Sequence, residues 1–150
     1  MFGLGREKRI ISWAYMLTKS GLLVHLFGRK GRPETEAEKG YFLACPYALG
    51  FMMGVCRKVA EGHGMTASQK IGAVSLKVFE QAAGLTAAEI SQSVGSYFGS
   101  KDPIFMDGFG DGAEFVLIVA SDDLDRMKKS SERVARYGQQ LFEGALVASG

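Results

Sequence analysis

The chain has 150 residues, 47% of them apolar, and a formal net charge of +2. The length fits one domain of ordinary size, and the apolar content is sufficient for a hydrophobic core, which excludes a largely disordered chain. The charges are unevenly placed, because residues 1–32 sum to +6 and residues 102–125 sum to −7. A basic segment beside apolar residues predicts an anionic partner, which could be a membrane surface, a nucleic acid or the chain's own acidic segment.

A first helix is expected from about Arg6 to Phe27. Its polar side chains would form one narrow stripe of Lys8, Ser12, Tyr15 and Lys19, so the rest of the cylinder should be covered by other elements. A basic, glycine-containing connector over residues 28–33 ends it. The cations at the two ends of this helix are candidate contacts to an anionic surface: Arg6, Lys8, Arg9, Arg29, Lys30 and Arg32.

A second helix is expected after Thr35, which forms a capping box with Glu38. It includes residues 41–56, a run without a charge, and Pro46 should kink or split it. Cys45 and Cys56 would lie about 16 Å apart on such a helix, too far for a disulfide. Two free buried thiols favour a reducing compartment, so we expect a cytoplasmic protein.

Two further helices are predicted by capping boxes, Thr66 with Gln69 and Thr86 with Glu89, with Gly84 ending the first of them. Residues 83–95 resemble the first half of a helix-turn-helix segment, with glycine at the turn and threonine as the cap. DNA-binding members place Arg, Lys, Asn or Gln on the next helix, whereas residues 96–102 supply only Lys101. Two capped helices explain the same string, and we do not expect nucleic acid as the partner.

The segment from Asp102 is predicted to be helical, because Asp102 and Pro103 suit the cap and the first helical position. Three glycines at 108, 110 and 112 each cost about 1 kcal/mol in a helix interior, and residues 115–119 would suit a buried strand. A lone strand has no partner, so the helix is favoured. From Ser121 a last helix is expected, with a stripe of apolar and small residues facing the core: Leu124, Met127, Ser131, Val134, Gly138, Leu141 and Ala145.

Two groups of residues are candidates for interaction. Asp107, Asp111 and Glu114 share one helical face and could meet a basic partner or a hard cation, although a solvated acidic face has the same pattern. Gly50 with Gly54, and Gly108 with Gly112, are spaced to let another helix approach closely, either within the chain or between subunits.

The remaining chemistry is sparse. The two histidines lack ligand partners at metal-binding spacing, residues 107–112 lack the strand and lysine of a phosphate loop, and the thiols lie in apolar surroundings that make them inert. We therefore expect no metal, no cofactor and no catalytic residues.

These patterns predict one all-α domain over residues 1–150, a bundle of five to six helices, with a basic helix and connector over 1–32 and a helical core over 33–150. No internal repeat is evident. The expected function is a non-catalytic module that binds another protein or copies of itself. A peripheral membrane protein using the basic first helix is the alternative, and a DNA-binding regulator the further alternative.

Overall fold

A computed structural model describes residues 2–27 and 35–149 of the chain, with side chains over 5–27 and 35–144. Every regular element within these ranges is a helix, so the all-α prediction is confirmed. Consecutive elements join end to end, and the result is seven continuous helical segments, called rods below, rather than the predicted five or six helices. In chain order the elements are α1 (Phe2–Thr18), η1 (Lys19–Leu23), α2 (Val24–Phe27), α3 (Glu36–Leu43), α4 (Pro46–Gly62), α5 (Ser68–Ala83), α6 (Ala87–Gly99), α7 (Pro103–Ser121), α8 (Leu124–Arg133), η3 (Val134–Gly138) and α9 (Gln139–Ser149).

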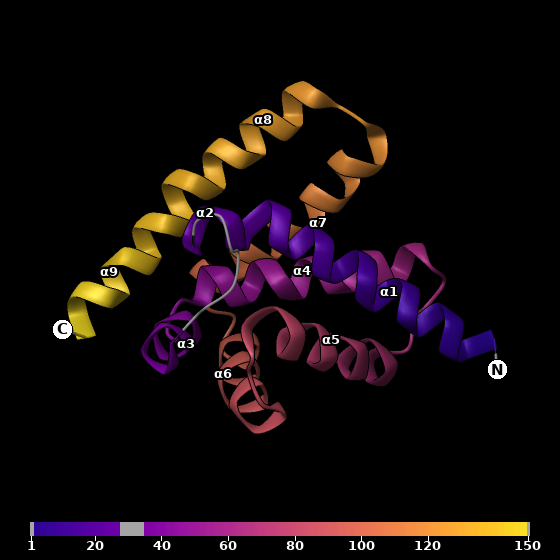
Figure 1. Ribbon diagram of the computed structural model, residues 1–150, viewed down its shortest axis with the longest axis horizontal. Coiled ribbons are helices and arrows are strands. Elements are labelled where there is room, and N and C mark those ends of the chain that lie inside the picture. The colour runs from indigo at the N-terminus through magenta and orange to yellow at the C-terminus, as the bar shows by residue number, and fades with distance from the viewer. Residues whose placement is uncertain (1, 28–34, 150) are drawn as a thin grey trace.

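The first rod joins α1 to α2 through the π-helical turn η1 and lies across α4 and α5 (Figure 1). One side of it is buried, including Ile10, Ala14 and Leu22. Its outer side is not covered as the polar stripe implied, because Trp13 is 51% exposed and Met16 57% exposed. The expectation of a helix enclosed on most sides is therefore wrong.

The predicted second helix consists of two helices, α3 and α4, whose axes differ by 80°. Thr35 caps α3 by accepting a hydrogen bond from the backbone N–H of Glu38 (3.1 Å). Pro46 is the first residue of α4, where its missing N–H costs no helical hydrogen bond. The proline therefore sets the start of α4, and the chain turns a corner before it.

The next two helices differ in how they begin. Thr86 and Glu89 form the predicted reciprocal capping box at the start of α6. The box predicted for Thr66 is wrong, because α5 begins at Ser68 after Ala67, which provides no side-chain cap. Gly84 ends α5 in the left-handed conformation, with φ of 67°, as its sequence position indicated.

The centre of the molecule is the contact between α4 and α7, which lie side by side and run in the same direction (Figure 1). Each of four glycines faces a backbone carbonyl of the other helix: Gly50 faces Phe105, Gly54 faces Phe109, Gly108 faces Tyr47 and Gly112 faces Phe51. A Cβ at any of these glycines would overlap that carbonyl. The glycines that weaken α7 as an isolated helix are thus what allows it to pack against α4.

These contacts repeat with an offset of 58 residues, which relates Gly50 to Gly108 and Phe51 to Phe109. Both helices carry the same Gly-Phe-x-x-Gly pattern in the crossing. Each also follows a shorter helix at a proline start, α3 before α4 and α6 before α7. Within this crossing, the contacts of α4 and α7 therefore have approximate two-fold symmetry.

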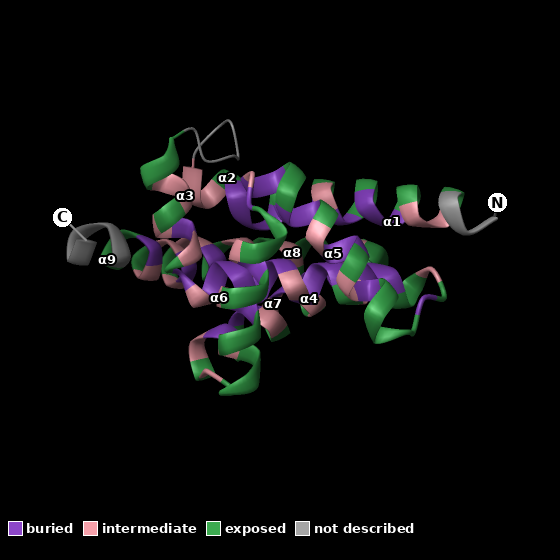
Figure 2. Cartoon of the chain, turned by 90° about the horizontal axis from the view of Figure 1, so that it is seen from below, coloured by how far each residue is buried: buried purple, intermediate pink, exposed green. Residues whose placement is uncertain are grey.

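The last rod, α8 through α9, extends along one edge of the molecule (Figure 1). Its burial differs from the predicted stripe, because Leu124 is 72% exposed and Leu141 is only half-buried, whereas Val134 and Phe142 are buried. The wider turn of η3 moves the inward face that follows it from position 141 to 142, whereas Leu124, which precedes η3, is exposed at the first position of α8. The alternation of buried and exposed residues along the other helices is visible in Figure 2.

Candidate functional site

The acidic face of α7 is occupied by side chains of the same chain. Asp111 accepts hydrogen bonds from the Tyr47 hydroxyl (2.7 Å) and from Arg133 Nε (2.8 Å). Tyr47 is fully buried, while the Asp111 side chain is 15% exposed. Asp111 therefore links the buried start of α4 to the last rod.

The other two acids of this face also contact the last rod. Asp107 accepts from the Tyr137 hydroxyl (3.2 Å), and Glu114 from Arg126 Nη2 (3.1 Å). Among the described residues, the cations that pair with this face are Arg126 and Arg133 of the last rod, while Arg29, Lys30 and Arg32 of the basic segment lie outside the described residues. These hydrogen bonds and ion pairs hold α8 and η3 against α7.

Burial sets the protonation of several groups in the core. Desolvation, and then the hydrogen bond to Asp111, raise the pKa of Tyr47, so its hydroxyl remains a donor to the carboxylate. Desolvation also raises the pKa of Cys45, and that of Cys56 to about 12. Both cysteines are free and buried, and both thiols are protonated at neutral pH.

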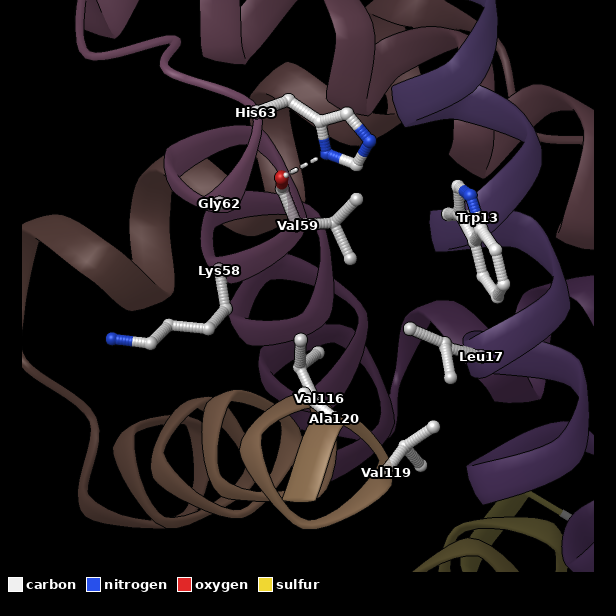
Figure 3. A pocket seen from close by; sticks show the side chains of 9 residues that line it. All are labelled: Trp13, Leu17, Lys58, Val59, Gly62, His63, Val116, Val119 and Ala120. Atoms are coloured by element: carbon white, nitrogen blue, oxygen red, sulfur yellow. Dashed lines mark hydrogen bonds between the residues drawn. The ribbon is translucent and has the colours of Figure 1, made fainter. Parts of the chain in front are cut away.

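A surface groove with a volume of about 300 Å³ opens between α1, the end of α4 and the end of α7 (Figure 3). We call it the α1–α4–α7 groove. Leu17, Val116 and Val119 point into the space between the helices, with Trp13 at its α1 side. The remaining lining residues are Lys58, Val59, Gly62, His63 and Ala120. Its walls are thus mostly apolar, with one aromatic ring half in solvent.

The polar groups of the groove lie at its α4 edge. His63 Nδ1 donates to the carbonyl of Val59 (2.9 Å), which leaves Nε2 as the other hydrogen-bonding atom of the ring. Lys58 lies 3.8 Å from Glu61 and extends away from the apolar walls (Figure 3). The groove can therefore hold an apolar group, with the His63 ring as a polar contact at this edge.

Exposed apolar side chains continue beyond the groove. Trp13 and Met16 lie on α1, Leu117 (50% exposed) on α7 and Leu124 at the start of α8. Of these residues, Trp13 is the one that lines the groove.

The predicted site residues fall into three groups. The four glycines lie together inside the α4–α7 contact, and the three acids bind the last rod. Lys8 and Arg9 are exposed on α1, and Arg6 is half-buried. Arg29, Lys30 and Arg32 lie outside the described residues. No group of three metal-ligating side chains occurs among the residues that the structure describes.

The sequence patterns missed the groove. Its walls come from three helices separated along the chain, so no local motif marks it. One signal was present: Trp13, the single tryptophan of the chain, stands on a helix whose other apolar residues are mostly core. By length and composition the helix Gly5–Phe27 could also cross a membrane, although 44% of its most apolar window is buried in the protein.

Comparison with known proteins does not identify the chain: no protein-family model matches it, and it has no significant similarity to a curated protein or to a solved structure.

Proposed function

We propose that this protein is a binding module that holds an apolar element of a protein partner in the α1–α4–α7 groove and performs no chemical step. The observation that carries the proposal is Trp13, half exposed above an apolar groove and adjacent to exposed Met16. Aromatic and methionine side chains are enriched where proteins bind one another, because they bury much area at low entropic cost.

The state of the titratable groups agrees with a binding role. The α7 carboxylates bind Arg126, Arg133, Tyr47 and Tyr137, and the thiols are buried in protonated form. The groove itself presents alkyl groups and one imidazole. Such a site suits recognition of side chains better than activation of a substrate.

Binding of anilinonaphthalene sulfonate tests whether the groove accepts an apolar group. Because Trp13 is the only tryptophan, quenching of its emission reports occupancy of this site. We expect saturable quenching in the wild type and a loss of it in Ala120→Gln, which places a polar chain across the groove. Ala73→Gln, the same change on the exposed side of α5, should bind normally. If a saturating concentration of the probe left Trp13 emission unchanged, the proposal would be refuted.

A peripheral membrane role is the second candidate. It is favoured by the outer side of α1, where Trp13 and Met16 lie among the exposed cations Lys8, Arg9 and Lys19. Because the opposite side of this helix belongs to the core, only the outer residues could enter a lipid surface. Co-sedimentation with phosphatidylcholine–phosphatidylglycerol vesicles should therefore show weak binding. Strong binding that is lost in the Lys8→Glu, Arg9→Glu double variant would favour the membrane role instead.

A further inference from the structure

We infer that the occupant of the α1–α4–α7 groove is the corner between α7 and α8 of a second copy of this chain, so that the protein forms a two-fold dimer. The inference rests on the proposed function of the groove and names its partner. It is carried by the composition of this corner and by its position next to the groove.

The corner presents one leucine between aspartates, in the run Asp122-Asp123-Leu124-Asp125. Leu124 is 72% exposed, the highest value among the large apolar side chains that the structure describes as exposed. The backbone beside it has defined ends: Asp123 caps α8 by accepting from the backbone N–H of Arg126 (3.1 Å), and Asp122 closes α7 in the left-handed conformation. A helix start thus holds an apolar side chain out in solvent.

The charges around the corner and the groove are complementary. Asp122 and Asp125 are exposed, and neither has an ion-pair partner among the described residues. Beside the groove stand Lys58, which lies 3.8 Å from Glu61, and the exposed Arg9, which lies one turn before Trp13 on the same side of α1 and has no ion-pair partner among the described residues. An acidic corner entering this groove would place its aspartates near Arg9 and Lys58, whereas an entirely apolar partner would leave Arg9 without a counter-charge.

The location of the two features makes the contact self-complementary. Val116, Val119 and Ala120 form one wall of the groove, and α7 ends at Ser121, directly before the corner. A two-fold axis near this end of α7 therefore brings the corner of each copy to the groove of the other, as an isologous interface requires. Leu117, on the flank between them, would be covered by the same contact.

Light scattering coupled to size exclusion, over a range of protein concentrations, tests the dimer. The wild type should dimerise, and Leu124→Asp should raise the dimer dissociation constant at least about tenfold, which corresponds to about 1.4 kcal/mol. This variant should fold normally, because an aspartate at the first position of a helix favours the helix dipole. Met106→Asp, at the opposite end of α7 with a side chain 37% exposed, is the matched control and should dimerise as the wild type does.

Two further measurements identify the surfaces in contact. Trp13 emission should shift to shorter wavelength as wild-type concentration rises, and should stay constant in Leu124→Asp. Lys58→Glu and Asp125→Lys should each weaken the dimer, and the double variant should recover part of the loss. A wild type that stays monomeric, or a dimer indifferent to Leu124→Asp, would overturn the inference.

Binding in the groove and formation of the dimer can be tested separately. Monomeric Leu124→Asp should still bind anilinonaphthalene sulfonate with quenching of Trp13. If the probe binds but the wild type does not dimerise, the proposed function stands and this inference fails. If monomeric Leu124→Asp shows no quenching, the groove itself is not a binding site.

Discussion

The close contact between α4 and α7 makes a sharp prediction about two glycines of one helix. At Gly112, an added Cβ would lie 2.9 Å from the carbonyl carbon of Phe51, about 0.5 Å inside the ordinary contact limit of 3.4 Å, and closer still to its oxygen. At Gly110, two residues away, an added Cβ meets nothing within 4 Å. Alanine should therefore have opposite effects at these positions.

The helix-propensity gain, about 1 kcal/mol per Gly→Ala change, is common to both variants and cancels in their comparison. The packing cost falls on Gly112 alone, and overpacking of this kind costs about 1 to 3 kcal/mol. We expect the upper part of this range, because the atoms in the way are backbone and cannot rotate aside. Gly110→Ala should be more stable than the wild type by about 0.5 to 1 kcal/mol, with Gly112→Ala about 1 to 3 kcal/mol below Gly110→Ala.

Urea unfolding followed by circular dichroism measures both free energies by linear extrapolation. Gly54→Ala, which would meet the carbonyl of Phe109, should behave like Gly112→Ala. If the stabilities of Gly110→Ala and Gly112→Ala agreed within about 0.5 kcal/mol, the backbone contact between α4 and α7 would not exist in the form described.

Three other predictions follow from burial and titration. Phe142→Ala should cost about 3 to 5 kcal/mol in unfolding free energy. Leu124→Ala, at a residue that is 72% exposed, should stay within about 0.5 kcal/mol, and equal losses would contradict the burial of Phe142 and the exposure of Leu124. The thiol of Cys56 has a pKa of about 12 in the folded protein, whereas in the unfolded chain it ionises near its ordinary pKa. The free energy of unfolding should therefore fall as pH rises above about 9. This group contributes up to about 1.4 kcal/mol per pH unit to the fall. Cys56→Ala should show a shallower fall between pH 9 and 11 in urea melts, and an unchanged slope would count against burial of the thiol. Arg126→Ala should lower the free energy of unfolding by no more than about 0.5 kcal/mol, because the guanidinium and Glu114 are both half exposed. A larger loss in urea melts at about 0.15 M salt would show that this pair stabilises the fold more than an ordinary surface ion pair.

Local patterns predicted the elements whose signals are themselves local. The cap of Thr86 with Glu89, the left-handed Gly84 and the start of α7 at Asp102 and Pro103 each depend on backbone groups within four residues, and each was predicted. Prediction failed where tertiary packing, rather than the local sequence pattern, set the start or the period of a helix. Thr66 has a suitable side chain, but the chain enters α5 two residues later. The stripe of the last helix assumed a constant period, which the π-helical turn at Val134–Gly138 interrupts.

The candidate site was less predictable than the fold. Spacing identified the four glycines as places of close approach and the three α7 acids as one face, yet it could not say which helix or which cations they meet. The groove had no sequence motif at all, because its walls belong to segments more than forty residues apart.

The sequence by itself determined that this protein is helical and where most of its helices begin. It also identified the glycines and the carboxylates of α7 as candidate contact residues. Only the tertiary structure decided that α4 and α7 run parallel in contact, that the acids of α7 hold the last rod, and that Trp13 and Leu124 remain in solvent. The physical reason is the range of the forces involved. Capping and helix propensity act within a turn or two, whereas the partner of a glycine, a carboxylate or an apolar face is chosen by packing among residues distant in the chain.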